Sequence, residues 1–460
     1  MVFSSIFFIF CFLPIFMLIY YLVPGKGKDI VLIIGSLLFY AWGEPIYVIL
    51  LVFSAVFNYY MGLELNDCPE ESRRLNMIFT VVVNLFILGF FKYYAFLLDS
   101  IGSVFRITLS HPELSLPIGI SFYTFKNLSY ILDVYNDKID PEPNFLTFCV
   151  YSMMFPHMAA GPIVRYADIE HQLYRHPVSI PKFGVGAEYF IKGLAKKVIL
   201  ADNLAVIYAA ISSRSSNAVL TAWIGIFAYT MQIYFDFSGY SDMAIGLGKM
   251  LGFDFLKNFD YPYLSESVAE FWRRWHISLG SWFRDYIYIP LGGNRVSVGK
   301  HIRNILVVWA LTGLWHGAAW NFVLWGVYYG LLLLLEKFAL GNVLDSAPAF
   351  VRRIYTMFCV MIGWVFFSQT SFPGIAKYLG TMFGPAASGF ADTATFYYFR
   401  TGIVLFVICI IACRPNLQNQ FKKLMKRNMA VAIAIDVILL ALATAFMVYN
   451  SYSPFLYQQF

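Results

Sequence analysis

Residues 265–293, SESVAEFWRRWHISLGSWFRDYIYIPLGG, and residues 304–330, NILVVWALTGLWHGAAWNFVLWGVYYG, are the basis of the fold that we predict for this chain. The second segment lies in a region without charged residues between Arg303 and Glu336, so we expect it to lie within a membrane. If a helix begins near Arg303 at the membrane surface, a rise of about 1.5 Å per residue places His316 roughly 20 Å inside. An ionisable side chain at that depth is costly, and it normally faces a protein-lined cavity and has a function.

The alternative for His316 is a neutral core histidine that bonds to a helical carbonyl or to Thr312. Two kinds of neighbour favour a functional role instead, because small residues let another backbone or a ligand approach, and tryptophans form rigid sides of a site. These neighbours are Gly313, Gly317, Trp315 and Trp320. We therefore interpret His316 as a candidate active-site residue.

Residues 265–290 predict an amphipathic helix with aromatic side chains on one face and charged side chains on the other. Ser265 is the expected N-cap, Pro290 ends the helix, and Gly292 and Gly293 turn the chain. This pattern is typical of a helix that lies along a bilayer surface or lines a funnel. His276 lies at the edge of the aromatic face, where its side chain either turns inward to a site or anchors the helix at the interface.

Several motifs resemble those of a known family. The segments FWRRWHISLGSWFRDYIYIPLGG and LTGLWHGAAWNFVLWGVYYG resemble the two histidine-bearing motifs of the membrane-bound O-acyltransferases. The segments MVFSSIFFIFCFLPIFMLIYYLVP, MMFPHMAAGPIVRY and QIYFDFSGYSDMAIGLGKMLG are similar to members that O-acetylate alginate, other exopolysaccharides or peptidoglycan, with the D-alanyl transferase of teichoic acids as a cousin. The resemblance implies that His316 is the catalytic histidine and His276 the second active-site histidine. It also implies an all-α, polytopic fold: a ring of tilted helices around a thinned centre, with a cytoplasmic and an external funnel.

The composition independently indicates an integral membrane protein. The chain is 59% hydrophobic and only 13% charged, whereas soluble domains have about 25% charged residues. Its six cysteines are scattered without a C-x-x-C pair, so we expect neither a disulfide framework nor a metal site. The net charge of +6 is modest and lies mostly in loops, which indicates membrane topology rather than nucleic-acid binding.

We expect residues 1–460 to form a single polytopic domain of roughly eleven or twelve spans, with additional re-entrant and interfacial helices. Residues 3–23 predict a retained first helix, and Lys26 and Lys28 after it indicate the cytoplasm, which places the amino terminus outside. Polar loops are expected at 64–75, 99–115 and 414–427, the last being basic and cytoplasmic. Further spans are expected at 30–42, 46–62, 76–98, 352–368, 396–413 and 429–449.

Residues 116–165 contain prolines, glycines and polar residues that favour re-entrant or half-length helices around a pore. His157 is a third candidate active-site group, and its alternative is a structural role beside Pro156. Lys126 and Arg165 are candidates to meet an anionic donor, and the alternative is that they extend towards the membrane surface.

Two further charged clusters have open interpretations. Lys192, Lys196 and Lys197 lie among apolar residues, a pattern that suits an anionic inner leaflet or, alternatively, the phosphates of coenzyme A. Asp236 and Asp242 interrupt an apolar run and favour either acid–base or ion-pathway chemistry. The alternative is structural pairing with Arg273, Arg274 or Arg284.

We expect His316 to act as a general base that takes a proton from a hydroxyl, which then attacks the thioester of acetyl-coenzyme A. His276 orients this donor or stabilises the oxyanion. The residues assigned to donor binding are Trp315, Trp320, Asn321, Arg273 and Arg274, and we expect no permanently bound cofactor. The carboxyl-terminal SPFLYQQF resembles a tail in which a tyrosine relays the acyl group, here Tyr457; the alternative is a tyrosine of an interfacial aromatic belt.

The expected partners are the lipid bilayer of a bacterial inner membrane, an external SGNH-hydrolase-like acetyltransferase and a cell-surface polysaccharide. This chain has no G-x-S-x-G motif of its own, so a separate protein would complete the transfer. Acyl transfer to teichoic acid, such as D-alanylation, or to a lipid remains an alternative. A secondary transporter is the alternative from a different class, because broken helices and charges within the membrane also occur there.

Overall fold

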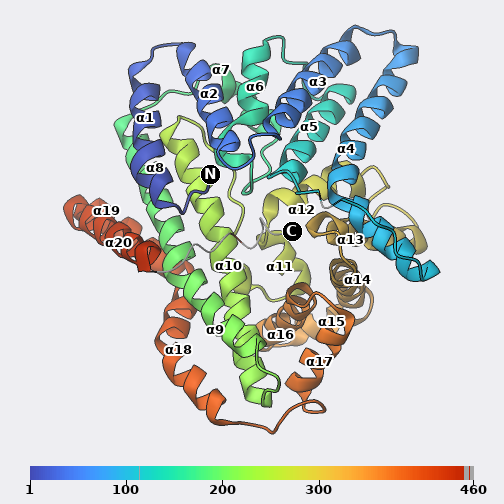
Figure 1. Ribbon diagram of the computed structural model, residues 1–460, viewed down its shortest axis with the longest axis vertical. Coiled ribbons are helices and arrows are strands. Elements are labelled where there is room, and N and C mark those ends of the chain that lie inside the picture. Colours follow the sequence, from blue (N-terminus) through green and yellow to red (C-terminus); the bar gives the residue numbers. More distant parts are fainter. Residues whose placement is uncertain (113, 450–454, 456–460) are drawn as a thin grey trace. The chain divides into compact units, whose positions relative to one another are not determined.

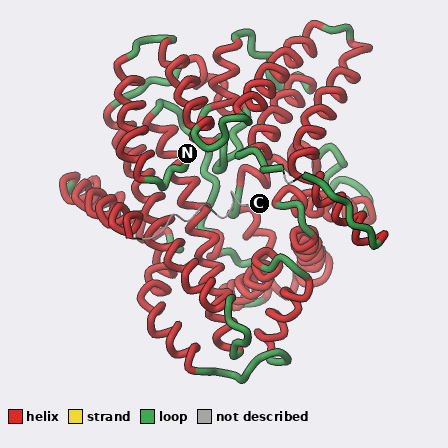
Figure 2. The backbone as a smooth tube through the Cα atoms, in the orientation of Figure 1, coloured by secondary structure: helices red, strands yellow, loops and turns green. Residues whose placement is uncertain are grey.

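The computed structural model describes residues 1–112, 114–449 and 455, and every regular element in this part of the chain is a helix (Figures 1 and 2). The all-α prediction is therefore confirmed. Six helical segments of this part are long and apolar enough to cross a membrane, in agreement with a polytopic protein. They are Val48–Asp67, Glu70–Phe105, Trp320–Ser346, Ala349–Ser368, Thr393–Ala412 and Met429–Tyr449.

The described residues divide into two compact units, which are treated separately below. The first consists of residues 1–190 and 241–256, and the second of residues 191–240, 257–449 and 455. Helices α8 (Ile180–Ala195) and α10 (Val219–Met250) contribute residues to both units. The ring of helices, its funnels and the single domain stay predictions.

The first unit contains the amino-terminal helices and the polar region around residue 126 (Figure 1). Helices α3, α4 and α5 pack against one another, and so do α2 and α6. Its elements are η1 (Phe8–Phe12), α1 (Leu13–Leu22), α2 (Gly27–Ala41), α3 (Val48–Asp67), α4 (Glu70–Phe105), α5 (Ile120–Tyr135), α6 (Phe145–Met153), η2 (Phe155–His157) and α7 (Tyr166–Tyr174).

The second unit contains both histidine-bearing motifs. Helices α13 and α14 form its most extensive helix pair. Its elements are η3 (Lys196–Ala201), α9 (Asp202–Ser212), η4 (Pro262–Leu264), α11 (Val268–Arg274), α12 (Ile277–Phe283), η5 (Arg284–Tyr288), α13 (Val298–His316), α14 (Trp320–Leu335), η6 (Glu336–Leu340), α15 (Gly341–Ser346), α16 (Ala349–Ser368), α17 (Phe372–Phe383), α18 (Thr393–Ala412), α19 (Pro415–Arg427) and α20 (Met429–Tyr449).

All three predicted loops are wrong in extent. In the predicted loop 99–115, helix α4 continues to Phe105. Residues 64–75 are almost entirely helical, because α3 continues to Asp67 and α4 begins at Glu70, directly after Pro69. Acidic residues in the first turn of α4 stabilise that start through the helix dipole. The basic segment 414–427 is likewise a helix, α19, rather than a loop. Polar composition alone predicted loops here, although an amphipathic sequence also suits a helix at a membrane surface.

Candidate active site

The continuous helix predicted over residues 265–290 is wrong, because the segment is divided into α11, α12 and η5. His276 joins α11 to α12 with φ 45°, a left-handed backbone conformation that favours glycine. The segment 258–260 holds this bend. The N–H of Ile277 donates to the Asn258 carbonyl at 3.0 Å, and the N–H of Asp260 donates to the Arg274 carbonyl at 2.9 Å. The bend turns the His276 side chain inward, where it is 2% exposed.

The N-cap of α11 is Ser267 and not Ser265 as predicted. The Ser267 hydroxyl accepts a hydrogen bond from the N–H of Glu270 at 3.0 Å. Ser265 and Ser267 precede the same apolar run, so the sequence alone did not show which of them caps the helix.

Asn258 determines which nitrogen of the neutral His276 ring carries the proton. Its Oδ1 accepts from the N–H of Ser278 at 3.1 Å, which identifies this atom as the oxygen, because a backbone N–H only donates. The same oxygen lies 3.2 Å from Nδ1 of His276. Nδ1 must therefore carry the proton of the neutral ring, and Nε2 carries the lone pair.

The continuous helix expected around His316 is also wrong. Helix α13 ends at His316, and α14 begins at Trp320. A Cβ atom on Gly326 would lie 2.3 Å from the carbonyl oxygen of Trp309, and one on Gly313 would lie 2.4 Å from that of Phe322. The two helices therefore turn back on each other and pack in backbone contact, which confirms the close approach expected beside Gly313. His316 lies at the tip of this helical hairpin, and its depth in a bilayer stays a prediction.

Trp315 brings the two histidines together. Its ring centroid lies 5.1 Å from that of His316 and 5.8 Å from that of His276, so both imidazoles flank one indole. His316 is 3% exposed and also contacts the rings of Trp325 and Phe367, with centroids at 4.9 and 5.4 Å.

Several aromatic residues of this site were missed by the sequence analysis. Phe237 of α10 contacts the His276 ring at 4.7 Å, and Trp272 contacts both Trp325 and Tyr329. Trp325 follows His316 by nine positions on the same apolar segment, and only the hairpin brings it back to the histidine. The sequence contained a signal for this hairpin in Gly313 and Gly326, where α13 and α14 are in contact.

The residues assigned to donor binding do not all gather at the histidines. Trp315 does, whereas Trp320 is 52% exposed. Asn321 is buried and donates to the Phe366 carbonyl at 3.3 Å. Arg273 is exposed, and Arg274 pairs with Glu270 at 2.7 Å.

The ion pairs of Asp236 and Lys197 differ from those predicted. The Lys197 ammonium lies 2.7 Å from the carboxylate of Asp236 and 2.8 Å from that of Asp202, so Asp236 pairs with this lysine and not with Arg273, Arg274 or Arg284. Lys197 is 2% exposed and therefore does not face a membrane surface. Burial of this cation is tolerated because both carboxylates neutralise it.

Tyr457 lies outside the described residues, but Phe455 is described and buried. The Phe455 ring packs edge-on against Tyr240 with centroids 4.7 Å apart, and the Lys197 ammonium lies 4.7 Å from its centroid. Tyr240 follows Phe237 by three positions on α10, so the two side chains lie on neighbouring turns of one face. Phe455 thus docks about one helical turn from the residue that contacts His276.

His157 and Lys126 form a separate buried group in the first unit. The Lys126 ammonium donates to the carbonyls of Tyr151 and Ser152 at 2.6 and 3.2 Å and lies 3.0 Å from Nδ1 of His157. Both side chains are fully buried, so Lys126 does not extend to a membrane surface.

Comparison with known proteins identifies the family to which these motifs belong. The family model described as MBOAT, membrane-bound O-acyltransferase family, matches residues 75–375, which include both histidines. The chain is 44% identical over 376 residues to a probable alginate O-acetylase of Azotobacter vinelandii, covering 80% of this chain and 75% of the relative. It is 32% identical over 421 residues to the peptidoglycan O-acetyltransferase of Helicobacter pylori, covering 84% and 80%.

A more distant relative is named for the transfer of a different acyl group, D-alanyl. The chain is 28% identical over 260 residues to the teichoic acid D-alanyltransferase of Bacillus subtilis, covering 50% of this chain and 63% of the relative. The family match indicates acyl transfer, and the matched residues include both histidine-bearing motifs. The chain therefore belongs to the membrane-bound O-acyltransferase family and is an acyltransferase.

Proposed function

We propose that this protein takes an acetyl group from cytosolic acetyl-coenzyme A and moves it across the membrane for O-acetylation of a cell-surface polysaccharide. The observation that carries the proposal is the pair of buried histidines on either side of Trp315, in a chain whose close relatives are named for O-acetylation of alginate and peptidoglycan. Family membership excludes the transporter alternative.

In the proposed reaction, His316 takes the proton of an attacking hydroxyl. The hydroxyl oxygen forms a bond to the thioester carbonyl carbon, and the carbon–sulfur bond breaks. The proton then passes from His316 to the departing sulfur, which leaves as the thiol of coenzyme A. An imidazole suits both steps, because it accepts and releases a proton near neutral pH.

His276 has a narrower role than the sequence implies. Its Nδ1 proton is engaged by Asn258, so the neutral ring offers a lone pair at Nε2 and accepts hydrogen bonds there. It would donate to an oxyanion only as an imidazolium, and burial disfavours that charge. We therefore assign it the orientation of the donor, by accepting a hydrogen bond from an amide N–H, rather than oxyanion stabilisation.

The attacking hydroxyl in this proposal belongs to Tyr457, which passes the acetyl group to an external SGNH-hydrolase-like partner. The docking of Phe455 on α10 supports this assignment, because Phe455 contacts Tyr240, three positions from the residue that contacts His276. Tyr457 follows this anchor by two positions.

We place the protein in a bacterial inner membrane with its amino terminus outside. The basic helix α19, which contains Lys422, Lys423 and Arg427, would then lie on the cytoplasmic side, and so would Lys26 and Lys28. The teichoic acid relative keeps D-alanyl transfer as a second candidate, although it matches only half of this chain.

The test uses the purified full-length protein in lipid nanodiscs with acetyl-coenzyme A labelled in the acetyl group. We expect release of free coenzyme A and label on Tyr457, detected by mass spectrometry after proteolysis, and we expect the His316→Ala variant to give neither. Coenzyme A release without label on Tyr457 would refute the relay alone. Intact acetyl-coenzyme A in the presence of folded wild-type protein would refute the donor assignment.

A further inference from the structure

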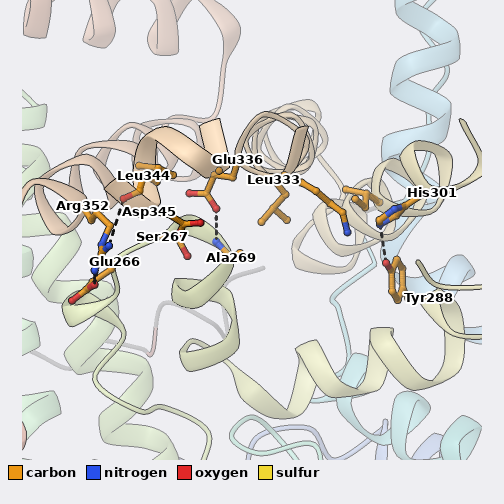
Figure 3. A pocket seen from close by; sticks show the side chains of 13 residues that line it. Glu266, Ser267, Ala269, Tyr288, His301, Leu333, Glu336, Leu344, Asp345 and Arg352 are labelled. Atoms are coloured by element: carbon orange, nitrogen blue, oxygen red, sulfur yellow. Dashed lines mark hydrogen bonds and ion pairs between the residues drawn. The ribbon is translucent and has the colours of Figure 1, made fainter. Parts of the chain in front are cut away.

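A cavity of about 600 Å³ in the second unit has no part in the mechanism proposed above (Figure 3). It is lined by residues of η5, α13, α14, η6, α15 and α16 and by the residues around the start of α11. Figure 3 shows the Glu336 carboxylate pointing across this space to the backbone of Ala269. The cavity thus gives access to a contact between η6 and α11.

Helix α11 depends on this contact for its amino-terminal hydrogen bonds. It has only seven residues, and such a short helix is not stable by itself. Its first N–H groups have no acceptor within the helix. Ser267 accepts from the third of them, and the Glu336 carboxylate accepts from the first two, the N–H of Val268 at 2.6 Å and that of Ala269 at 3.0 Å.

Glu336 is well suited to hold a helix in place. It is 7% exposed and lies 68 positions from Val268, so the bond ties together distant parts of the chain. A carboxylate is a charge-assisted acceptor and forms stronger bonds than a neutral group. The π-helical element η6, which begins with Glu336, follows directly after α14.

The same two helices meet again near the histidines. Trp272 of α11 packs against Trp325 and Tyr329 of α14, with ring centroids at 5.3 and 4.8 Å. Trp325 also contacts His316, and α11 ends two positions before His276. A shift at the start of α11 would therefore move His276 relative to His316.

We propose that Glu336 is a positioning residue for acyl transfer: its carboxylate holds the amino terminus of α11 and thereby sets the place of His276 beside the hairpin that carries His316. This inference rests on the proposed function. Without the carboxylate, the buried N–H of Val268 and the partly buried N–H of Ala269 lose their acceptor, and α11 loses the contact that fixes it.

The experiment uses chemical rescue, because the cavity leaves room for a small anion beside α11. In Glu336→Ala, we expect turnover of acetyl-coenzyme A to fall more than about tenfold, in line with the loss of two charge-assisted hydrogen bonds. Formate should restore a large part of this turnover by occupying the vacated carboxylate position. Glu336→Gln fills the same space but has only one acceptor oxygen, so we expect an intermediate loss and no response to formate.

Asp345→Asn is the matched control. Asp345 lines the same cavity, and no N–H of α11 donates to it. We expect this variant to keep wild-type turnover with or without formate. A formate-induced rise in the turnover of Asp345→Asn equal to that of Glu336→Ala would show a nonspecific salt effect and overturn the proposal.

A second measurement does not depend on activity. Hydrogen–deuterium exchange of peptides covering residues 265–276 should be faster in Glu336→Ala and slower again with formate. Unchanged exchange would overturn the proposed hold on α11, and faster exchange with undiminished turnover would overturn its role in positioning. If wild-type protein does not turn over acetyl-coenzyme A, the proposed function fails, and the exchange data still decide whether Glu336 holds α11.

Discussion

Two buried imidazoles in this protein, His157 in the first unit and His276 in the second, have different partners at the same ring nitrogen. Nδ1 of His157 lies 3.0 Å from the side-chain nitrogen of Lys126, and Nδ1 of His276 donates to the Asn258 amide oxygen at 3.2 Å. An amide oxygen only accepts, so Asn258 sets the position of the proton on His276, whereas the tautomer of His157 follows the charge of Lys126. The neighbour of a buried histidine, rather than burial itself, determines which chemistry the ring offers.

The neighbours of Lys126 indicate a structural group. Its side-chain nitrogen donates to the carbonyls of Tyr151 and Ser152 and lies within hydrogen-bond distance of Nδ1 of His157, so it has three polar partners. Such a saturated network holds backbone in place. His276 and His316 instead lie against aromatic rings around Trp315, where a substrate carbonyl and a hydroxyl are the chemically suitable additions.

The largest expected effect comes from the histidines themselves. His316→Ala should lower acetyl transfer by roughly 10²- to 10⁴-fold, the usual contribution of a general base. His157→Asn should keep most of the activity, because its side-chain oxygen replaces the acceptor for Lys126. Both are measured as coenzyme A release by folded, purified protein. Equal losses of activity in His316→Ala and His157→Asn would contradict the distinction between a catalytic and a structural histidine.

A smaller effect is expected from Asn258, which fixes the His276 ring. Asn258→Ala should lower turnover by roughly tenfold to a hundredfold, because a misplaced ring orients the donor poorly. Ser278→Ala is the control, since it removes only a hydroxyl that donates to the same oxygen at 2.9 Å. The idea fails if Asn258→Ala is as active as Ser278→Ala.

The two histidines of the candidate site could be picked out from the sequence, but their arrangement and several of their aromatic neighbours could not. His276 and His316 stand out because they interrupt aromatic and apolar runs. The bend at His276 was missed, because helical periodicity continues through it and only the backbone bonds to residues 258–260 create it. Asn258 lies in a segment without a helix or a motif, so nothing in the sequence marked it.

Charged residues in apolar segments were the least predictable. Lys197 follows an amphipathic pattern that suits a membrane surface, yet it is buried against Asp236, 39 positions away. Such pairing depends on which helices become neighbours, which is a property of the whole fold. The six apolar segments, by contrast, follow from local hydropathy alone.

Lys126 should affect stability rather than chemistry. Lys126→Met removes the donor to two buried carbonyls and a histidine, and an unsatisfied buried acceptor costs about 1 to 3 kcal/mol. We expect a lower thermal midpoint in detergent and unchanged turnover per folded molecule. A tenfold loss of turnover in well-folded Lys126→Met would show that this group also takes part in the reaction.

The smallest expected effect is on the pH dependence of stability, and each unit contributes one carboxylate that is paired with arginine. Hydrogen bonds from Arg352 and Arg353 lower the pKa of Glu266, close to α11, and a hydrogen bond from Arg73 lowers the pKa of Asp137, just after α5. A lowered pKa means that the folded protein binds this proton less readily than the unfolded chain. The stabilisation is therefore complete above the ordinary carboxyl pKa and is lost as the pH falls through the lowered value.

Thermal midpoints of the wild type, Glu266→Gln and Asp137→Asn at pH 7 and pH 4 test this. Each variant should be slightly less stable than the wild type at pH 7, and the difference should shrink at pH 4, where these carboxylates begin to take up protons in the unfolded wild-type chain. The effect is small because solvent reaches both ion pairs and screens them in part. A difference in thermal midpoint that grew at pH 4 would mean that the folded state favours the protonated carboxyl, which contradicts its pairing with arginine. Growth in only one of the two variants would show that the two units differ in this respect.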